Sequence, residues 1–208
     1  PACPRQELVV SNNRIRNVLF DLDGTLADTA PDLAYALNAL LQEQGQTALP
    51  FNTIRPSVSL GGIAMVRLAF DIDEDSTEFG ALKTRFLEIY RSNIARHTML
   101  FEGMEQVLST FDSSHLPWGI VTNKASWLTE PLMQELNLNT RTSCIVSGDT
   151  VEHSKPHPAP LLHACELLRC RAEETLYVGD ARRDIEAGNR AAMTTLIASY
   201  GYIDEHEE

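Results

Sequence analysis

Two aspartates, Asp21 and Asp23, directly follow a short apolar run, and their spacing gives this sequence its clearest chemical feature. Residues 18–20 are typical of a buried strand of a parallel sheet, which Gly24 then ends. Since side chains at positions i and i+2 of a strand point to the same side, the two carboxylates are expected to lie near each other. They repel unless a cation or a shared proton relieves them. This motif alone also fits a solvated acidic turn, so its interpretation depends on the rest of the chain.

Polar side chains follow further apolar runs or lie in the loops between them, namely Thr122 with Asn123, Lys155, and Asp180 with Asp184. The carboxylates of Asp21 and Asp180 can give oxygen ligands to Mg²⁺, which also accepts a phosphate oxygen. Lys155 adds a compact positive charge, and Thr122 adds a hydroxyl group. Two carboxylates and a phosphate dianion would repel by several kcal/mol, at about −4 in total, without Mg²⁺ and a lysine. The pattern therefore predicts a cation and phosphate site.

Strands and helices must alternate to bring these residues together. Apolar runs predict five strands, at 18–20, 118–121, 142–146, 175–178 and 194–198, and helical spacing predicts helices at 126–136, 160–168 and 184–192. This alternation predicts an α/β fold with a Rossmann-like parallel sheet. In such sheets, ligands bind outside the carboxyl ends of the strands, where the polar residues above are placed.

Residues 30–97 contain helical patterns and no clear strand. Helices are expected at 29–44, 51–58, 63–70 and 75–97. They form an insertion after the first strand, over the ligand crevice. The predicted organisation is therefore a catalytic core of residues 1–29 and 98–208 and a small helical cap domain of residues 30–97. Gly103 and residues 112–114 are expected to be joint and loop positions.

Composition narrows the partners. The chain has 208 residues, a net charge of −12 and a pI near 4.9, which disfavours nucleic acid and anionic membranes as partners. No apolar segment is long enough to span a membrane. The four cysteines show no metal-type spacing and predict free thiols in a reducing cytoplasm. A small-molecule phosphate ester is the expected partner, and the chain is expected to be a monomer or a homodimer.

Four motifs in order resemble those of the phosphatases in the haloacid dehalogenase-like superfamily. They are DLDGTLADT from Asp21, VTN from Val121, SKP from Ser154 and GDARRD from Gly179. The resemblance covers residues 17–203, and the helical insertion is similar to the small cap of that family. It implies the same Rossmann-like core, Mg²⁺ as the cofactor and phosphoryl transfer as the reaction.

The resemblance also implies a role for each motif residue. Asp21 would be the nucleophile that forms an aspartyl-phosphate, and Asp23 would be the general acid and then the general base. Asp21, the backbone carbonyl of Asp23 and Asp180 would bind Mg²⁺. Thr122, Asn123 and Lys155 would bind the phosphoryl group. Asp184 would orient Lys155 or a metal-bound water.

Several further stretches resemble the phosphoglycolate phosphatase group, and LFEGM, VTNK and the final YGY are equally similar to its N-acetylmuramic acid 6-phosphate phosphatase branch. The expected substrate is 2-phosphoglycolate, with the amino-sugar phosphate as the alternative. An acid at Asp23 fits hydrolysis of an alkyl phosphate, but it also fits a sugar phosphomutase. A non-catalytic scaffold is disfavoured because binding alone needs no acid there.

Substrate choice is expected in the cap loop, at Ser59, Gly61 and Gly62 with Arg67 nearby. Lys124 has two readings that remain open, contact with the substrate or a solvated charge. One departure from the motifs is His157 in SKPHP, where relatives usually have Asp or Asn.

Overall fold

The computed structural model describes residues 15–203. Cys3 and the acidic tail from residue 204 lie outside the described residues. A central sheet has five parallel strands in the order β5-β4-β1-β6-β7. Their bounds are Asn17–Phe20 (β1), Trp118–Val121 (β4), Cys144–Val146 (β5), Thr175–Gly179 (β6) and Thr194–Ile197 (β7). The five predicted strands and the α/β fold are therefore confirmed, although β5 begins two residues later than expected.

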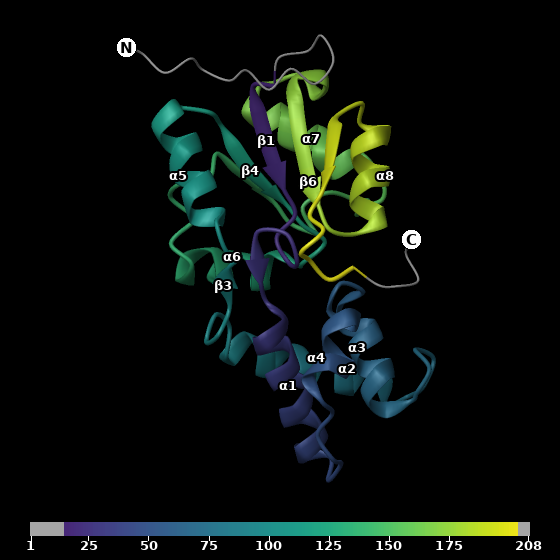
Figure 1. The fold of residues 1–208 in the computed structure, drawn as a ribbon. Coiled ribbons are helices and arrows are strands. Elements are labelled where there is room, and N and C mark those ends of the chain that lie inside the picture. Colours follow the sequence, from purple (N-terminus) through teal and green to yellow (C-terminus); the bar gives the residue numbers. More distant parts are fainter. Residues whose placement is uncertain (1–14, 204–208) are drawn as a thin grey trace.

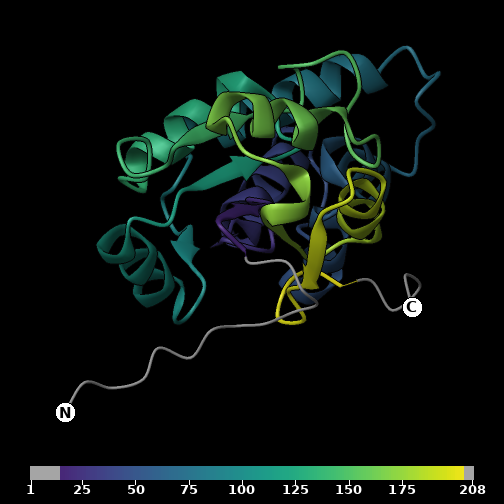
Figure 2. The ribbon, with the colours of Figure 1, turned by 90° about the horizontal axis from the view of Figure 1, so that it is seen from above.

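Strand β1 lies at the centre because both of its faces and both of its edges are covered. Val18 and Phe20 pack on one side with helices α5 (Met104–Ser114) and α6 (Ser126–Glu135). Leu19 packs on the other side with α7 (Ala159–Leu168) and α8 (Arg182–Arg190). Figures 1 and 2 both place α5 and α8 on opposite sides of the strands. A strand buried on both faces is a continuous apolar run, which is the pattern that residues 18–20 show.

Helix α5 corrects an expectation. Residues 112–114 were expected to be a loop but lie in the last turn of this helix, where Ser113 Oγ and Ser114 Oγ each donate a hydrogen bond to the Thr110 carbonyl. Serine side chains that bond back to the helix in this way are compatible with a helix end.

A 3₁₀ turn, η2 (Ala172–Glu174), precedes β6.

The inserted segment contains four α-helices. They are α1 (Ala30–Glu43), α2 (Phe51–Ile54), α3 (Gly61–Phe70) and α4 (Phe79–Ser92), and the 3₁₀ turn η1 (Arg55–Val58) follows α2. Helix α4 is shorter than the predicted range 75–97. The polar stretch 71–78 forms turns because Asp and Ser side chains compete with the helix for backbone groups. Figure 1 shows these helices beyond the carboxyl ends of β1, β4 and β6.

Two short strands connect the insertion to the sheet, and neither was predicted. Strands β2 (Ala27–Asp28) and β3 (Met99–Leu100) pair antiparallel, Ala27 with Leu100 and Asp28 with Met99. Two-residue strands carry too little periodicity to be read from sequence. The expected cap boundaries at residues 29 and 98 fall beside this pair.

Candidate active site

Three carboxylates gather at the carboxyl ends of β1 and β6. Asp21 follows β1, Asp180 follows β6 and Asp184 lies in the first turn of α8, and one oxygen of each lies within 4.8 Å of the others. All three are buried. The sheet brings the two loops together because β1 and β6 are hydrogen-bonded neighbours, with Phe20 opposite Val178. The structure thus assembles residues that are more than 150 positions apart.

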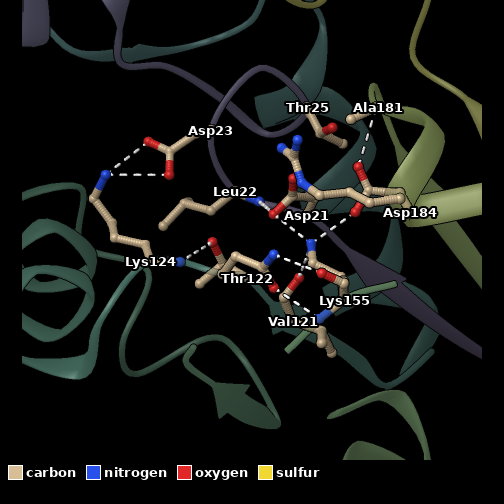
Figure 3. Close-up of polar contacts among 12 residues, drawn as sticks. Asp21, Leu22, Asp23, Thr25, Val121, Thr122, Lys124, Lys155, Ala181 and Asp184 are labelled. Carbon is tan, nitrogen blue, oxygen red and sulfur yellow. Dashed lines mark hydrogen bonds and ion pairs between the residues drawn. The ribbon is translucent and has the colours of Figure 1, made fainter. Parts of the chain in front are cut away.

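Lys155 binds two of these carboxylates at once. Its Nζ lies 2.9 Å from Asp21 Oδ1 and 2.7 Å from Asp184 Oδ1, and its side chain is fully buried (Figure 3). Nζ also donates to the Val121 carbonyl at 2.9 Å and to the Tyr177 hydroxyl at 2.8 Å. A buried ammonium held by four oxygens has one fixed position. It offers a defined positive charge beside Asp21.

Burial and charge act differently on the three acids. Burial raises the pKa of Asp21 to about 7, although the charge of Lys155 opposes this. Burial also raises the pKa of Asp180. Burial opposes ionisation of Asp184 as well, but there Lys155 and Arg183 prevail and lower its pKa. Three ionised carboxylates carry more negative charge than the single ammonium of Lys155 can neutralise, so the cluster favours a further cation or a proton.

This donor set fits a hard divalent cation. Mg²⁺ prefers carboxylate and carbonyl oxygens, and the grouped atoms are all carboxylate oxygens. Two hydrogen bonds fix the Asp180 carboxylate in a position where it could bind the cation. Thr25 Oγ1 donates to its Oδ1 at 3.1 Å, and the Tyr202 N–H donates to its Oδ2 at 2.8 Å. Gly24 is required here. It has φ +83°, and a Cβ atom at this position would collide with the Asp180 carboxylate.

Asp23 faces away from the metal cluster. Its carboxylate lies 2.9 Å from Lys124 Nζ (Figure 3), and it accepts a hydrogen bond from Thr29 Oγ1 at 2.5 Å. Asp23 Oδ atoms do not belong to the grouped metal donors of residues 15–203. The proposed metal contact through its backbone carbonyl stays a prediction. Asp21 and Asp23 therefore point to different partners, which separates their chemical roles.

The phosphate-binding residues from sequence lie beside Asp21. Thr122 is buried at the end of β4, and its Oγ1 accepts a hydrogen bond from the Lys124 N–H at 3.1 Å. The Asn123 side chain binds the loop of Lys155 instead. Its Nδ2 donates to the Lys155 carbonyl and its Oδ1 accepts from the Lys155 N–H, both at 3.0 Å. Phosphate binding by Thr122, Asn123 and Lys155 stays a prediction.

A cavity of about 550 Å³ lies between the sheet ends and the inserted helices. Asp21, Asp23 and Thr122 line its floor, and Ser59, Gly61 and Gly62 line it from the other side, as expected for the cap loop. Arg183 joins the two sides, because its Nη2 donates to Ser59 Oγ at 3.2 Å.

Arg67 was expected near the substrate, but the structure directs it elsewhere. It does not line this cavity. Its side chain is 54% exposed and lies 3.9 Å from Asp73 and from Glu74. The reason is helical periodicity. Met65 lines the cavity, and a residue two positions further along α3 points about 200° away from it.

Sequence reasoning missed several cavity residues. Lys83, Phe86 and Tyr90 line it from α4, and Trp127 lines it from α6. The sequence leaves Lys124 open between substrate contact and a solvated charge. The structure buries its side chain to 7% exposure, against Asp23 and 4.8 Å from the Tyr90 ring centroid, so the solvated reading is wrong. These contacts join the sheet to the inserted helices. A local sequence pattern does not predict contacts between segments so far apart in the chain.

Tyr202 was also missed, although the final YGY stretch had been noted. Its N–H binds Asp180, while its hydroxyl donates to Asp28 Oδ1 at 2.7 Å and accepts from the Ala30 N–H at 2.9 Å. Arg55 lies over the ring at 4.9 Å. One buried tyrosine therefore connects the acidic cluster to the start of the inserted helices.

Fold and site together define a class of α/β hydrolase with acidic groups and a buried lysine at the ends of a parallel sheet. Residues 18–198 match the model of the haloacid dehalogenase-like hydrolase family, and the chain belongs to this family.

Two protein names recur among the relatives with similar sequences. The chain is 45% identical over 190 residues to an N-acetylmuramic acid 6-phosphate phosphatase of Pseudomonas putida, covering 91% of this chain and 85% of the relative. It is 40% identical over 188 residues to a phosphoglycolate phosphatase of Xanthomonas campestris, covering 90% and 84%. Among solved structures, a predicted phosphoglycolate phosphatase of Haemophilus somnus superposes with a TM-score of 0.81 at 26% identity, covering 90% and 87%.

Proposed function

We propose that the protein is a Mg²⁺-dependent phosphoric monoester hydrolase that acts on a small phosphorylated acid through an aspartyl-phosphate. The observation that carries this proposal is the buried lysine between Asp21 and Asp184, next to Asp180. Phosphoryl transfer needs a nucleophile beside fixed positive charge, and this arrangement supplies both. The names of the relatives agree with a phosphatase.

The proposed reaction has two steps on the residues of this chain. An Asp21 oxygen attacks phosphorus, the bond from phosphorus to the ester oxygen breaks, and Asp23 gives its proton to the departing alkoxide. Asp23 then takes a proton from water, whose oxygen attacks phosphorus and releases phosphate and the Asp21 carboxylate. Lys155 and Thr122 hold the phosphoryl oxygens. Asp21, Asp180 and the Asp23 carbonyl would hold Mg²⁺, which supplies positive charge for the pentacoordinate transition state.

The two names among the relatives give two candidate substrates, and the cavity favours the larger. Sequence patterns favoured 2-phosphoglycolate, whose alcohol is among the smallest hydroxy acids. A volume of about 550 Å³ falls in the range of pockets that enclose drug-sized ligands. Trp127 is 45% exposed in this wall and offers an aromatic face to a sugar ring. These features favour N-acetylmuramic acid 6-phosphate, with 2-phosphoglycolate as the second candidate.

Two further features bear on the setting of the reaction. No helix among residues 15–203 is long and apolar enough to cross a membrane. Cys144, Cys165 and Cys170 are free thiols, which supports the proposal of a cytoplasmic enzyme.

The test is phosphate release by the purified protein with and without Mg²⁺, comparing N-acetylmuramic acid 6-phosphate, 2-phosphoglycolate and glucose 6-phosphate. Mg²⁺-dependent release from one of the two acids at the highest kcat/KM supports the proposal. Stoichiometric loss of the phosphoryl group to a sugar acceptor, without release to water, would instead identify the mutase that the motif also permits.

A further inference from the structure

Lys83 is a cation placed in an otherwise apolar stripe of helix α4. Lys83, Phe86, Leu87 and Tyr90 all line the cavity, at positions i, i+3, i+4 and i+7 of one helix face. Its inward position is therefore fixed by the packing of its neighbours, since Phe86 and Tyr90 are fully buried. Lys83 is half-buried there, and a side-chain charge that is partly withdrawn from water is stabilised by an anionic partner.

The other lysines that face this site already have partners. Lys155 binds Asp21 and Asp184, and Lys124 binds Asp23. The Lys83 ammonium, by contrast, forms no hydrogen bond or ion pair with any residue in the range 15–203. The Tyr90 hydroxyl on the same face is buried and lies against the Lys124 ammonium, which is paired with Asp23. An unpaired cation on the wall of this cavity indicates an anionic ligand.

The position of Lys83 sets the length of that ligand. Tyr90 lies at the reaction end of the helix, since its ring is 4.8 Å from Lys124 Nζ, which is 2.9 Å from Asp23. Seven residues of α-helix separate it from Lys83, a rise of roughly 10 Å. Helical side chains also lean toward the N-terminus, which moves the Lys83 ammonium further from Asp23.

We propose that Lys83 is a specificity-determining residue that binds a carboxylate at the far end of the substrate alcohol, on the order of 10 Å from the reacting phosphorus. This inference rests on the proposed function and narrows it to the substrate class of acidic sugar phosphates. N-acetylmuramic acid 6-phosphate carries its lactyl carboxylate on the opposite part of the ring from its phosphate. The carboxylate of 2-phosphoglycolate is adjacent to the ester and falls short of Lys83.

The experiment compares two sugars that differ in this carboxylate. N-acetylglucosamine 6-phosphate has the same acetamido sugar and phosphate but no lactyl group. Lys83→Met should raise KM for N-acetylmuramic acid 6-phosphate by about tenfold to hundredfold, because a charge-assisted contact is lost. It should change KM for N-acetylglucosamine 6-phosphate by less than about twofold, and Lys83→Arg should restore most of the loss.

Arg91→Met is the matched control, since Arg91 is an exposed cation on the same helix outside the cavity. It should leave both KM values unchanged. An equal effect of Lys83→Met on both sugars, or no effect on either, would overturn the assignment. A rise in KM confined to 2-phosphoglycolate would also overturn it, because Lys83 would then bind a carboxylate close to the phosphate.

A binding measurement separates this inference from the proposed function. Calorimetric titration of the two sugars into the Asp21→Asn variant, with and without Lys83→Met, requires no turnover. If the wild-type protein releases no phosphate from any ester, the proposed function fails. The assignment of Lys83 fails if Lys83→Met leaves the affinity for N-acetylmuramic acid 6-phosphate unchanged or weakens the binding of both sugars equally.

Discussion

Lys124 Nζ lies 2.9 Å from Asp23 Oδ1 and 3.1 Å from Asp23 Oδ2, 101 residues away in the sequence. Burial alone would lower the pKa of Lys124, but the negative charge of Asp23 raises it. Tyr90 of helix α4 closes over the ammonium. The pair therefore holds the proposed proton carrier at the contact between the sheet and the inserted helices.

This pair should contribute measurable coupling to stability. Lys124→Met leaves Asp23 without its cation, and Asp23→Asn leaves a lysine of 7% side-chain exposure without its anion. Each single variant should lower the free energy of unfolding, and the double variant should lose less than their sum, with a coupling of about 1–3 kcal/mol. Urea unfolding of the four proteins measures this coupling, and additive losses would show that the two charges do not interact.

Asp21→Asn should abolish turnover without unfolding the protein. The substitution keeps the shape of the side chain and leaves Lys155 paired with Asp184 at 2.7 Å. An amide cannot form the acyl-phosphate, so kcat should fall by a factor on the order of a thousand or more. Phosphate release measures the loss, and circular dichroism checks the fold. Activity within tenfold of wild type would remove Asp21 from the nucleophile role.

Mg²⁺ affinity should depend steeply on pH. Burial raises the pKa of Asp21 to about 7 in the metal-free protein, so the carboxyl group is mostly protonated below that pH. A proton and Mg²⁺ then compete for the same oxygens. The apparent Kd should rise about fivefold from pH 7 to pH 6 and level off above pH 8. Calorimetric titration at several pH values tests this, and a constant Kd would contradict it.

Tyr202→Phe should destabilise the junction between the sheet and the inserted helices. The Tyr202 side chain is buried, and its hydroxyl serves both Asp28 and the Ala30 N–H. Removing it takes away both hydrogen bonds and leaves the Ala30 N–H with only its longer bond to Asp28 Oδ1 at 3.3 Å, which costs about 1–3 kcal/mol. Urea unfolding gives the loss. Tyr200→Phe is the control, because its hydroxyl donates one hydrogen bond, to the Thr25 carbonyl, among residues 15–203 and the residue is 42% exposed, so its loss should be smaller.

Trp127→Ala should weaken binding of a sugar substrate and spare a small one. If the indole stacks on the sugar, KM for N-acetylmuramic acid 6-phosphate should rise about threefold to tenfold, with little change in KM for 2-phosphoglycolate. Steady-state kinetics with both esters tests this. Arg67→Ala serves as the control outside the cavity and should leave both values unchanged. If Arg67→Ala raised these KM values more than Trp127→Ala does, the placement of Arg67 outside the cavity would be wrong.

Lys83 shows what a closer reading of the sequence could have found. It occupies the inward stripe of α4 together with Phe86, Leu87 and Tyr90. A lysine in an otherwise apolar helical stripe is unusual, and that irregularity is visible in the sequence. The predicted helix 75–97 includes this stripe, and Lys83 is a residue in it that the sequence prediction omits.

The sequence by itself determined the five strands and the order of the motifs. Apolar runs such as residues 18–20 must be buried on both faces, and a polar residue directly after such a run must lie at the end of a strand. These are local constraints, so Asp21 and Asp180 could be assigned to one edge of the sheet from the sequence, whereas Lys155 lies further along, in the loop after β5.

Only the tertiary structure decided which groups pair. Asp23 turns from the acidic cluster to Lys124, Arg183 reaches Ser59, Tyr202 connects Asp180 to Asp28, and Arg67 points outward. The physical reason is that these contacts join segments far apart in the chain across the junction of sheet and inserted helices. Their partners depend on how α1 to α4 dock and rotate. Successive residues of a helix are about 100° apart around its axis, so a shift of one or two positions moves a side chain from the cavity to solvent.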